Sequence, residues 1–479
     1  MQLNGGNDGL NTLIPLDQYS NLTAARPDVI LPENKVLSLN GLSGTGIHPA
    51  MSKLRDMYND GKMHIVQNVG YPNQNYSHFR STDIWLTGSD SDEVLTSGWV
   101  GRYLAEEWPN YPEGFPNEDM EDPLAIQIGS LVSPVCQGPA VNMGLAISNP
   151  TNFYQLLSGD FGETPDTWAG KELSFVRTVA HQSNAYALRA KAAAEKASNL
   201  STKYPDGNSL ANQLKIVAQL IAGGLKTRVY IVTQGGFDTH ANQVDATGGN
   251  ETGYHASLLQ KVSEAIDAFQ DDIELLKIDD RVLGMTFSEF GRRVVSNGSI
   301  GTDHGSAAPL FLFGSNVKSG MTGKNPVIPS NASVNTNLPM EVDFRSIYST
   351  ILQDWFCLNK EISDSVLLHN FDSMGIITSS CNSTSISKHV QSKAGNAFIT
   401  NYPNPFGSST TVRYYSDGGL VNINVLDSQG RIVELLVSSQ IPQGSHEIVF
   451  DASRLSPGTY YCQYQNGMVG QTKSLLKVR

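Results

Sequence analysis

Short apolar runs bounded by turn residues alternate along the chain with longer stretches in which apolar positions recur every three to four residues. The short runs predict buried strands, and they lie at 63–69, 125–128, 228–233, 282–287 and 309–313. The longer stretches predict amphipathic helices, and they lie at 47–60, 171–198, 208–224, 255–275 and 342–356. Strands that alternate with helices predict an α/β fold with a mostly parallel sheet in a three-layer arrangement.

The pattern changes near the C-terminus. A polar stretch rich in Ser and Thr follows Gly375 and predicts a linker. From about residue 397 only short strands separated by Gly, Pro and Asn turns are expected, at 412–415, 421–426, 432–437, 446–450, 460–465 and 473–478. A module of this kind predicts a small immunoglobulin-like sandwich. The chain therefore divides into a core over 1–376, a linker over 377–396 and an all-β module over 397–479.

Composition narrows the classes of partner. The 479 residues carry a net charge of −13 and show no basic stripe, which argues against binding to nucleic acid or to an anionic membrane surface. The chain contains no run of 18 apolar residues, so a membrane-spanning helix is not expected. The four cysteines form no CxxC pair. Cys357 and Cys381 are close enough in sequence to form a disulfide in an oxidising compartment, and four free thiols are the open alternative.

The first residues leave little room for a first strand. Met1, Gln2 and Leu3 run directly into Asn4-Gly5-Gly6, whereas a strand usually needs about five residues. We therefore expect the natural chain to begin upstream, with the rest of this strand and an export signal.

Three short strings place acids and histidines beside glycines. They span Asn4–Asn11, Gly235–His240 and Gly301–Gly305, and two of them come just after predicted strands. Loops at the ends of strands converge at one edge of an α/β sheet, and Asp oxygens and neutral His nitrogens are suitable ligands for divalent ions. The candidate metal ligands are Asp8, Asp238, His240, Asp303 and His304.

Each candidate ligand also has a structural explanation. Asp8 can cap a helix or bond its own turn. Asp238 and His240 can form a hydrogen bond of purely structural value. Asp303 and His304 can cap a helix that begins there. The sequence leaves these alternatives open.

Four further residues are candidates for catalysis. Ser77 follows the strand 63–69 by a short loop and is the best hydroxyl nucleophile, and the adjacent His78 is a candidate base or ligand. Glu289 is a candidate ligand or general base, and Arg292, with Arg293 beside it, is a candidate for binding an anionic oxygen. An Arg–Glu ion pair that closes this loop is the alternative. His48 and His255 lie in predicted helices and are expected at the surface or in packing.

The C-terminal module resembles a known sorting domain. The strings Asn401-Tyr402-Pro403-Asn404-Pro405-Phe406, Gly458–Tyr461 and Lys473–Arg479 are similar, in order and spacing, to the type A C-terminal sorting domain of the type IX secretion system. The resemblance implies export across the outer membrane of a Bacteroidetes-type bacterium and recognition by that secretion machinery. It therefore implies a protein that passes the periplasm and is secreted or held at the cell surface.

The core resembles domain-of-unknown-function family 1501 over residues 4–356. The matching strings, besides the three above, are Ser77–Phe79, Gly98–Arg102, Ala241–Gln243, Ser288–Arg293 and Asp343–Arg345. This family is grouped with the alkaline phosphatase and sulfatase superfamily, and the resemblance implies that Asp8, the pair Asp303-His304 and the pair Asp238/His240 bind metal. The core differs from the superfamily pattern in the spacing of Asp238-Thr239-His240 and in the lack of a third histidine after His304.

These observations predict a secreted, metal-dependent hydrolase of phosphate or sulfate esters. The expected cofactor is a divalent ion, which can be zinc, manganese, calcium or iron. Arg345 is a candidate for supporting the site from behind the ligands. The alternative is a non-catalytic surface protein that keeps the fold to bind a glycan or a cell-wall polymer.

Overall fold

The computed structural model describes residues 1–150, 167–245, 247–378, 381, 399–402, 404, 406–416, 418–427, 430–466 and 469–478. The chain divides into two units, Met1–Ser385 and Ile386–Arg479. Most of the expected linker 377–396 lies outside the described residues.

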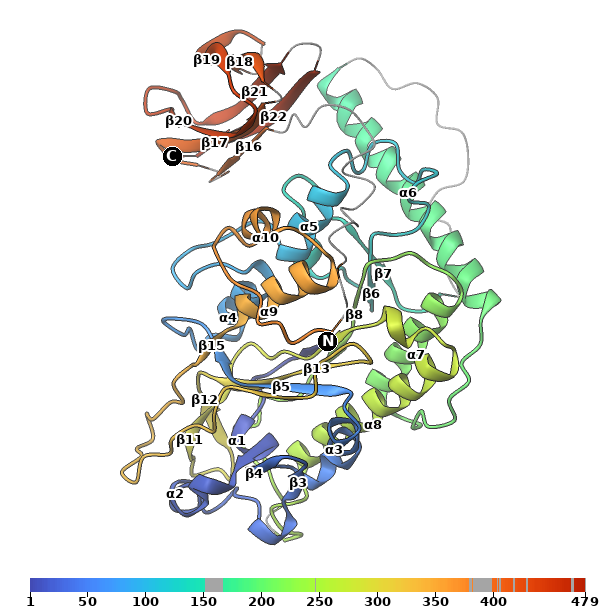
Figure 1. Ribbon diagram of the computed structural model, residues 1–479, viewed down its shortest axis with the longest axis vertical. Coiled ribbons are helices and arrows are strands. Elements are labelled where there is room, and N and C mark those ends of the chain that lie inside the picture. The colour runs from blue at the N-terminus through green and yellow to red at the C-terminus, as the bar shows by residue number, and fades with distance from the viewer. Residues whose placement is uncertain are drawn as a thin grey trace. The chain divides into compact units, whose positions relative to one another are not determined.

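Strands and helices of the first unit follow one another in the order drawn in Figure 1. The strands are β1 (Gln2–Leu3), β2 (Leu13–Pro15), β3 (Leu37–Leu39), β4 (Leu42–Ile47), β5 (Met63–Gly70), β6 (Ala125–Ile128), β7 (Gly144–Ile147), β8 (Val229–Ile231), β9 (Thr233–Gln234), β10 (Gly284–Met285), β11 (Arg292–Ser296), β12 (Thr302–His304), β13 (Ala308–Phe313), β14 (Gly320–Thr322) and β15 (Val342–Asp343). The helices are α1 (Gly9–Thr12), α2 (Tyr19–Ala25), α3 (Ser52–Asn59), α4 (His78–Thr87), α5 (Trp99–Glu107), α6 (Trp168–Lys196), α7 (Ser209–Ala222), α8 (Tyr254–Leu275), α9 (Phe344–Thr350) and α10 (Lys360–Leu367).

The strand pairs of this unit have both orientations. β7, β6 and β8 are parallel neighbours, and β9 pairs in parallel with β1. Hydrogen bonds of Leu3 and Phe287 connect β1 to the segment after β10. β13 is antiparallel to both β10 and β5, and β14 and β15 are parallel to β5. The unit is therefore a mixed α/β fold.

Alternate residues of β13 enter two different hydrophobic clusters. Phe311 and Phe313 pack with residues of α3, α7 and α8, whereas Leu310 and Leu312 pack with residues of α4, α5 and α9. Successive side chains of a strand point to opposite faces, so each cluster covers one face. Figure 1 shows α3 and α8 on one side of β5 and α4 and α9 on the other.

Most predicted elements of this unit are present, with three differences. The helix expected over 47–60 begins only at Ser52, because Ile47 pairs with Leu13 in β4 and Pro49 opens a short 3-10 turn. Over 282–287 only β10 is regular, and after it Thr286 and Phe287 still donate backbone hydrogen bonds to Phe311 and Met1. The last predicted helix is split, because α9 is followed by a π-helical turn over Ile351–Trp355.

The second unit consists of two antiparallel sheets around one core, and the all-β prediction is confirmed. One sheet has the order β16-β17-β20 and the other the order β19-β18-β21-β22. Buried side chains from β17, β18, β20, β21 and β22 form a single cluster. The strands are β16 (Ile399–Tyr402), β17 (Ser409–Ser416), β18 (Gly419–Leu426), β19 (Ile432–Ile441), β20 (Gly444–Asp451), β21 (Gly458–Asn466) and β22 (Val469–Lys477).

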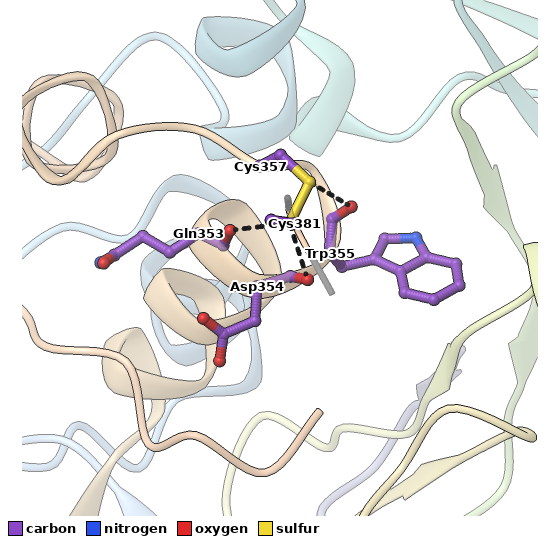
Figure 2. The surroundings of a disulfide bond; sticks show 5 residues. All are labelled: Gln353, Asp354, Trp355, Cys357 and Cys381. Atoms are coloured by element: carbon purple, nitrogen blue, oxygen red, sulfur yellow. Dashed lines mark hydrogen bonds between the residues drawn. A yellow bond between two sulfur atoms is a disulfide. The ribbon is translucent and has the colours of Figure 1, made fainter. Parts of the chain in front are cut away.

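A disulfide joins Cys357 to Cys381 at the C-terminal end of the first unit (Figure 2). The residues just before Cys381 are also fixed to the first unit. Thr378 donates a backbone hydrogen bond to Asn316, and Ile377 forms an isolated β-bridge with Val317. The structure therefore has the Cys357–Cys381 disulfide and not the alternative of four free thiols. Cys136 and Cys462 are free and buried, and burial raises the pKa of each thiol to about 12.

Replacing Cys357 with serine is expected to lower the free energy of unfolding of the first unit by about 2–4 kcal/mol. The bond closes a loop with a sequence separation of 24 residues, which restricts the unfolded chain. Urea denaturation followed by tryptophan fluorescence measures this change. A reductant should destabilise the wild-type chain to a similar extent and leave the Cys357→Ser variant unaffected; a wild-type chain insensitive to reductant would contradict the prediction.

Candidate metal centre

Acidic and histidine side chains from separate segments of the first unit meet at one place. Asp238 and His240 follow β9, His304 is the last residue of β12, and His78 is the first residue of α4. Glu289 follows β10 and reaches the same group. Side chains beyond strand ends thus converge, as the α/β pattern predicts.

A glycine allows the loop after β1 to pack against this group. Gly5 has a φ of +121°, and a Cβ atom there would lie 2.3 Å from the backbone nitrogen of Asp238. Only glycine accepts both the positive φ and the close approach. Its N–H donates a hydrogen bond of 2.8 Å to Oε1 of Glu289, which attaches the Asn4–Asn11 string to the site.

Three imidazole rings converge on Oδ1 of Asp238. The Nε2 atoms of His240 and His304 each lie 3.2 Å from this oxygen, and Nε2 of His78 lies 3.4 Å from it. The Nε2 atoms of His240 and His304 are also 2.8 Å from each other. One ligand atom from each of His78, Asp238 and His304 lies within 4.8 Å of the other two.

The Nδ1 atom of each ring faces a hydrogen-bond acceptor. Nδ1 of His78 lies 2.8 Å from Oε1 of Glu289, and Nδ1 of His240 lies 3.0 Å from Oδ1 of Asp303. Nδ1 of His304 lies 2.8 Å from the carbonyl oxygen of Tyr76. A neutral imidazole that donates through Nδ1 carries its lone pair on Nε2. In the tautomers that donate through Nδ1, all three Nε2 lone pairs point toward Asp238.

This arrangement fits a bound cation. Nε2 of His78 is buried and has no hydrogen-bond partner in the part of the chain that the structure describes. In these tautomers the facing Nε2 atoms of His240 and His304 oppose lone pair to lone pair, which is unfavourable without a positive charge between them. Imidazoles whose second nitrogen donates to a carboxylate or a carbonyl are the usual surroundings of a protein-bound metal ion.

The carboxylates of the site are held in their ionised form. Burial raises the pKa of Asp238, but the hydrogen bond and the charge of Arg292 outweigh it, and the net pKa is lowered. Burial likewise opposes ionisation of Asp303, and hydrogen bonds from Asn297 and His240 lower its pKa on balance. Burial also lowers the pKa of His304, which favours its neutral, ligating form.

Arg292 is buried and donates to acceptors of the protein itself. Its guanidinium bonds the carbonyl oxygens of Gly5, Gly6, Phe237 and Thr302, and it lies 2.8 Å from Oδ1 of Asp238. Arg293 donates to the carbonyl oxygens of His304 and Val334 and to the side chain of Asn335. Both arginines thus tie the loops of the site together, and their expected role in binding an anion stays a prediction.

Asp8 lies in a buried ion pair beside the cluster. Both of its oxygens are 3.0 Å from Nη1 of Arg26, and Gln243 donates to Oδ2. Burial raises the pKa of Asp8, but the charge of Arg26 overcomes this effect and the net pKa is lowered. Asp8 occupies the N-cap position of α1 without a side-chain capping bond. Its predicted role as a ligand is untested, and its two oxygens already bind a cation from the protein.

Two structural alternatives are wrong. Asp303 and His304 do not begin a helix, because they lie in β12, where His304 pairs with Arg292 of β11. Within the described part of the chain, Glu289 pairs with no arginine. Its carboxylate accepts from Gly5, Ser288 and His78 instead.

The remaining candidates have different surroundings. Ser77 is exposed at the N-cap of α4, beside His78, and makes no side-chain capping bond. His48 and His255 are buried, which confirms a packing role and excludes the surface. Arg345 bonds Asp343 and Asp90.

A second group, Asp90, Glu93 and His369, also has the spacing of metal ligands. Arg345 already lies 2.5 Å from Oδ1 of Asp90. Arg80 donates to the carbonyl oxygens of Asp90 and Glu93. Positive charge from the protein therefore occupies this group, and we assign no ion to it.

The free energy of unfolding is expected to fall as the pH drops from about 6.5 to about 4. Burial lowers the pKa of His255 to about 4 and that of His48 to about 3. Both therefore stay neutral in the folded chain, whereas the unfolded chain binds protons below pH 6.5. Each contributes up to roughly 1.4 kcal/mol per pKa unit. Urea denaturation between pH 7 and pH 4 measures the slope, and His255→Gln should flatten it; an equal slope in both proteins would contradict the prediction.

The third imidazole of the cluster belongs to His78, which the sequence offered as a base or a ligand without deciding between these roles. The superfamily pattern places a third histidine after His304, whereas His78 precedes His304 by 226 positions. The available signal was the string Ser77-His78-Phe79, in which Ser77 is the candidate nucleophile and His78 a candidate base or ligand. The contacts of His78 with Asp238 and Glu289 favour the ligand role.

Comparison with known families agrees with both resemblances. Residues 170–366 match the family described as Protein of unknown function (DUF1501), and residues 400–478 match the Secretion system C-terminal sorting domain. The C-terminal unit is a sorting domain. It directs the chain to the type IX secretion machinery, and hence to the cell surface or the extracellular space. Among the described residues, no helix is long and apolar enough to cross a membrane.

Solved structures supply remote likenesses. One is a protein in the alkaline phosphatase superfamily from Vibrio parahaemolyticus, with 10% identity, a TM-score of 0.33, and coverage of 92% of this chain and 81% of that one. Another is from work on the metabolism of multiple glycosaminoglycans by Bacteroides thetaiotaomicron, with 10% identity, a TM-score of 0.35, and coverage of 95% and 90%. No curated protein matches the chain.

Proposed function

We propose that the first unit is an exported, metal-dependent hydrolase of phosphate or sulfate esters. The observation that carries the proposal is the convergence of three imidazole Nε2 atoms on the Asp238 carboxylate, with each Nδ1 held by an acceptor. His78, Asp238, His240 and His304 would hold the ion. Asp303 and Glu289 would orient two of the imidazoles.

The ligand chemistry narrows the choice of metal. A set of imidazole nitrogens and one carboxylate suits zinc, iron or manganese, whereas calcium prefers oxygen ligands alone. When bound, such an ion polarises an ester oxygen and lowers the pKa of a coordinated water molecule.

The start of α4 would bind the anionic part of the substrate. α4 has 10 residues, and the first N–H groups of a helix have no partner within it and attract anions. Ser77 lies at this end, its hydroxyl makes no capping bond, and it is exposed. Ser77 therefore keeps its predicted place as the nucleophile, with Gly5 and Arg292 fixing the loop that carries Asp238.

We extend the proposal to the architecture. The sheet with helices packed on both faces would be the three-layer arrangement of the alkaline phosphatase type, with β13 as its antiparallel strand. The two sheets of the sorting domain would form an immunoglobulin-like sandwich. The domain limits would be 1–376, 377–396 and 397–479.

The test is metal content followed by a hydrolysis assay. The purified full chain should retain zinc, manganese or iron in mass spectrometry after gel filtration. The metal-loaded chain should then hydrolyse 4-nitrophenyl phosphate or 4-nitrophenyl sulfate. A folded chain that takes up none of these ions, or one that binds an ion and hydrolyses no phosphate or sulfate ester, would overturn the proposal.

A further inference from the structure

The side chain of Gln243 lies beneath the candidate centre and is fully buried. Its Nε2 donates to Oδ2 of Asp8 over 2.5 Å. Its Oε1 accepts from the hydroxyl of Thr239 over 3.0 Å and from the hydroxyl of Thr302 over 2.7 Å. One amide group thus joins three segments that are far apart in the sequence.

Both threonines belong to the segments that carry the candidate ligands. Thr239 lies between Asp238 and His240, and Thr302 begins the strand that ends at His304. The N–H of Thr302 also donates to the carbonyl oxygen of Thr239 over 3.1 Å. Any shift of one hydroxyl away from Gln243 would therefore change the distance between the two ligand segments.

Asp8 gives this connection a fixed end. Its carboxylate is held by Arg26, and neither side chain is exposed to solvent. Buried polar groups of this kind are costly to leave unpaired, so each member of the network keeps the others in place. The contacts of Asp8 with Arg26 and Gln243 are those of an anchor behind the centre.

We infer that Gln243 is a positioning residue for the metal centre, one that sets the spacing between the Asp238–His240 segment and the Thr302–His304 segment from its anchor at Asp8. The inference rests on the metal centre proposed above. It assigns functional value to the amide of Gln243 and the hydroxyls of Thr239 and Thr302, none of which touches the ion or the substrate.

The test compares zinc affinity in four variants of the full chain. Gln243→Met and Thr302→Val remove hydrogen bonds with little change in shape, and Thr302→Ser restores the hydroxyl. Thr350→Val is the matched control, because Thr350 is a buried threonine of α9 whose hydroxyl donates to Ser346 and accepts from Met374. The Kd for Zn²⁺ is measured by competition with a chromophoric chelator, and stability by urea denaturation of the metal-free chains.

Loss of a group behind the ligands typically weakens metal binding by about 10–100-fold. We expect that increase in Kd for Gln243→Met and Thr302→Val, and wild-type affinity for Thr302→Ser and Thr350→Val, although Thr350→Val is also destabilised. If Gln243→Met fails to fold, the pair Thr302→Val and Thr302→Ser decides. Wild-type zinc affinity in a destabilised Thr302→Val would overturn the positioning role alone, whereas a wild-type chain that takes up no zinc, manganese or iron would overturn the centre itself.

Discussion

Replacing Asp238 with alanine is expected to reduce affinity for the divalent ion by more than about 100-fold, beyond what loss of a group behind the ligands typically costs, and to abolish ester hydrolysis. Oδ1 of Asp238 is the atom on which the three imidazoles converge. The side chain is 48% exposed, but its truncation leaves the buried guanidinium of Arg292 without its counter-charge. That guanidinium keeps four backbone carbonyl acceptors, so the loss of stability should be about 1–3 kcal/mol. Metal per chain by mass spectrometry and turnover of 4-nitrophenyl phosphate and 4-nitrophenyl sulfate measure the two effects.

A carboxylate far from the cluster provides the control for Asp238→Ala. Asp372 is 90% exposed and its nearest cation is Lys360, at 3.7 Å. Asp372→Ala should retain both metal and activity. Metal retained at the wild-type level by Asp238→Ala would contradict the assignment, and an unfolded Asp238→Ala would indicate a structural role instead.

Replacing Asp8 with asparagine is expected to lower the free energy of unfolding by about 3–5 kcal/mol. The substitution leaves the guanidinium of Arg26 buried without a counter-charge, since both side chains have no exposed surface. Removing one partner of a buried ion pair is costly for this reason, whatever the net value of the intact pair. All five tryptophans lie in the first unit, so tryptophan fluorescence during urea denaturation reports on this unit.

An ion pair that is only partly buried shows how much of that loss comes from full burial. Asp364 lies 2.7 Å from Lys360 on the surface of α10, and Asp364→Asn should cost no more than about 1 kcal/mol. The opposite result for Asp8→Asn, unchanged stability together with loss of bound metal, would show that Asp8 is a ligand after all.

The hydrophobic pattern predicted the elements that are buried along most of their length or along one whole face. The runs at 63–69, 125–128 and 309–313 lie in β5, β6 and β13, and the helix at 255–275 is α8. The first strand expected at residues 1–3 is β1, whereas β11 and β12 were not predicted. β12 has only three residues, too few to show a periodicity, and β11 begins with two arginines. Such strands form only where tertiary contacts bring their partners to them.

The chemistry of the site was more predictable than its geometry. The strings Gly235–His240 and Gly301–Gly305 were correctly chosen as segments that meet, since His240 contacts both Asp303 and His304. Arg292 was chosen for its charge, yet the fold uses its donors on backbone carbonyls. The sequence shows which hydrogen-bonding groups are available. It does not show which of them will bond to the backbone and which will stay free for a ligand.

The sequence alone predicted an α/β core, an all-β sorting domain, the export route and the residue types of the proposed metal centre, because these depend on local periodicity, composition and short motifs. Only the tertiary structure decided that His78 joins Asp238, that Glu289 holds His78 and that Asp8 pairs with Arg26. It also decided that Cys357 pairs with Cys381, which spacing had left open. These contacts connect residues distant in sequence, and their formation depends on how the whole core packs.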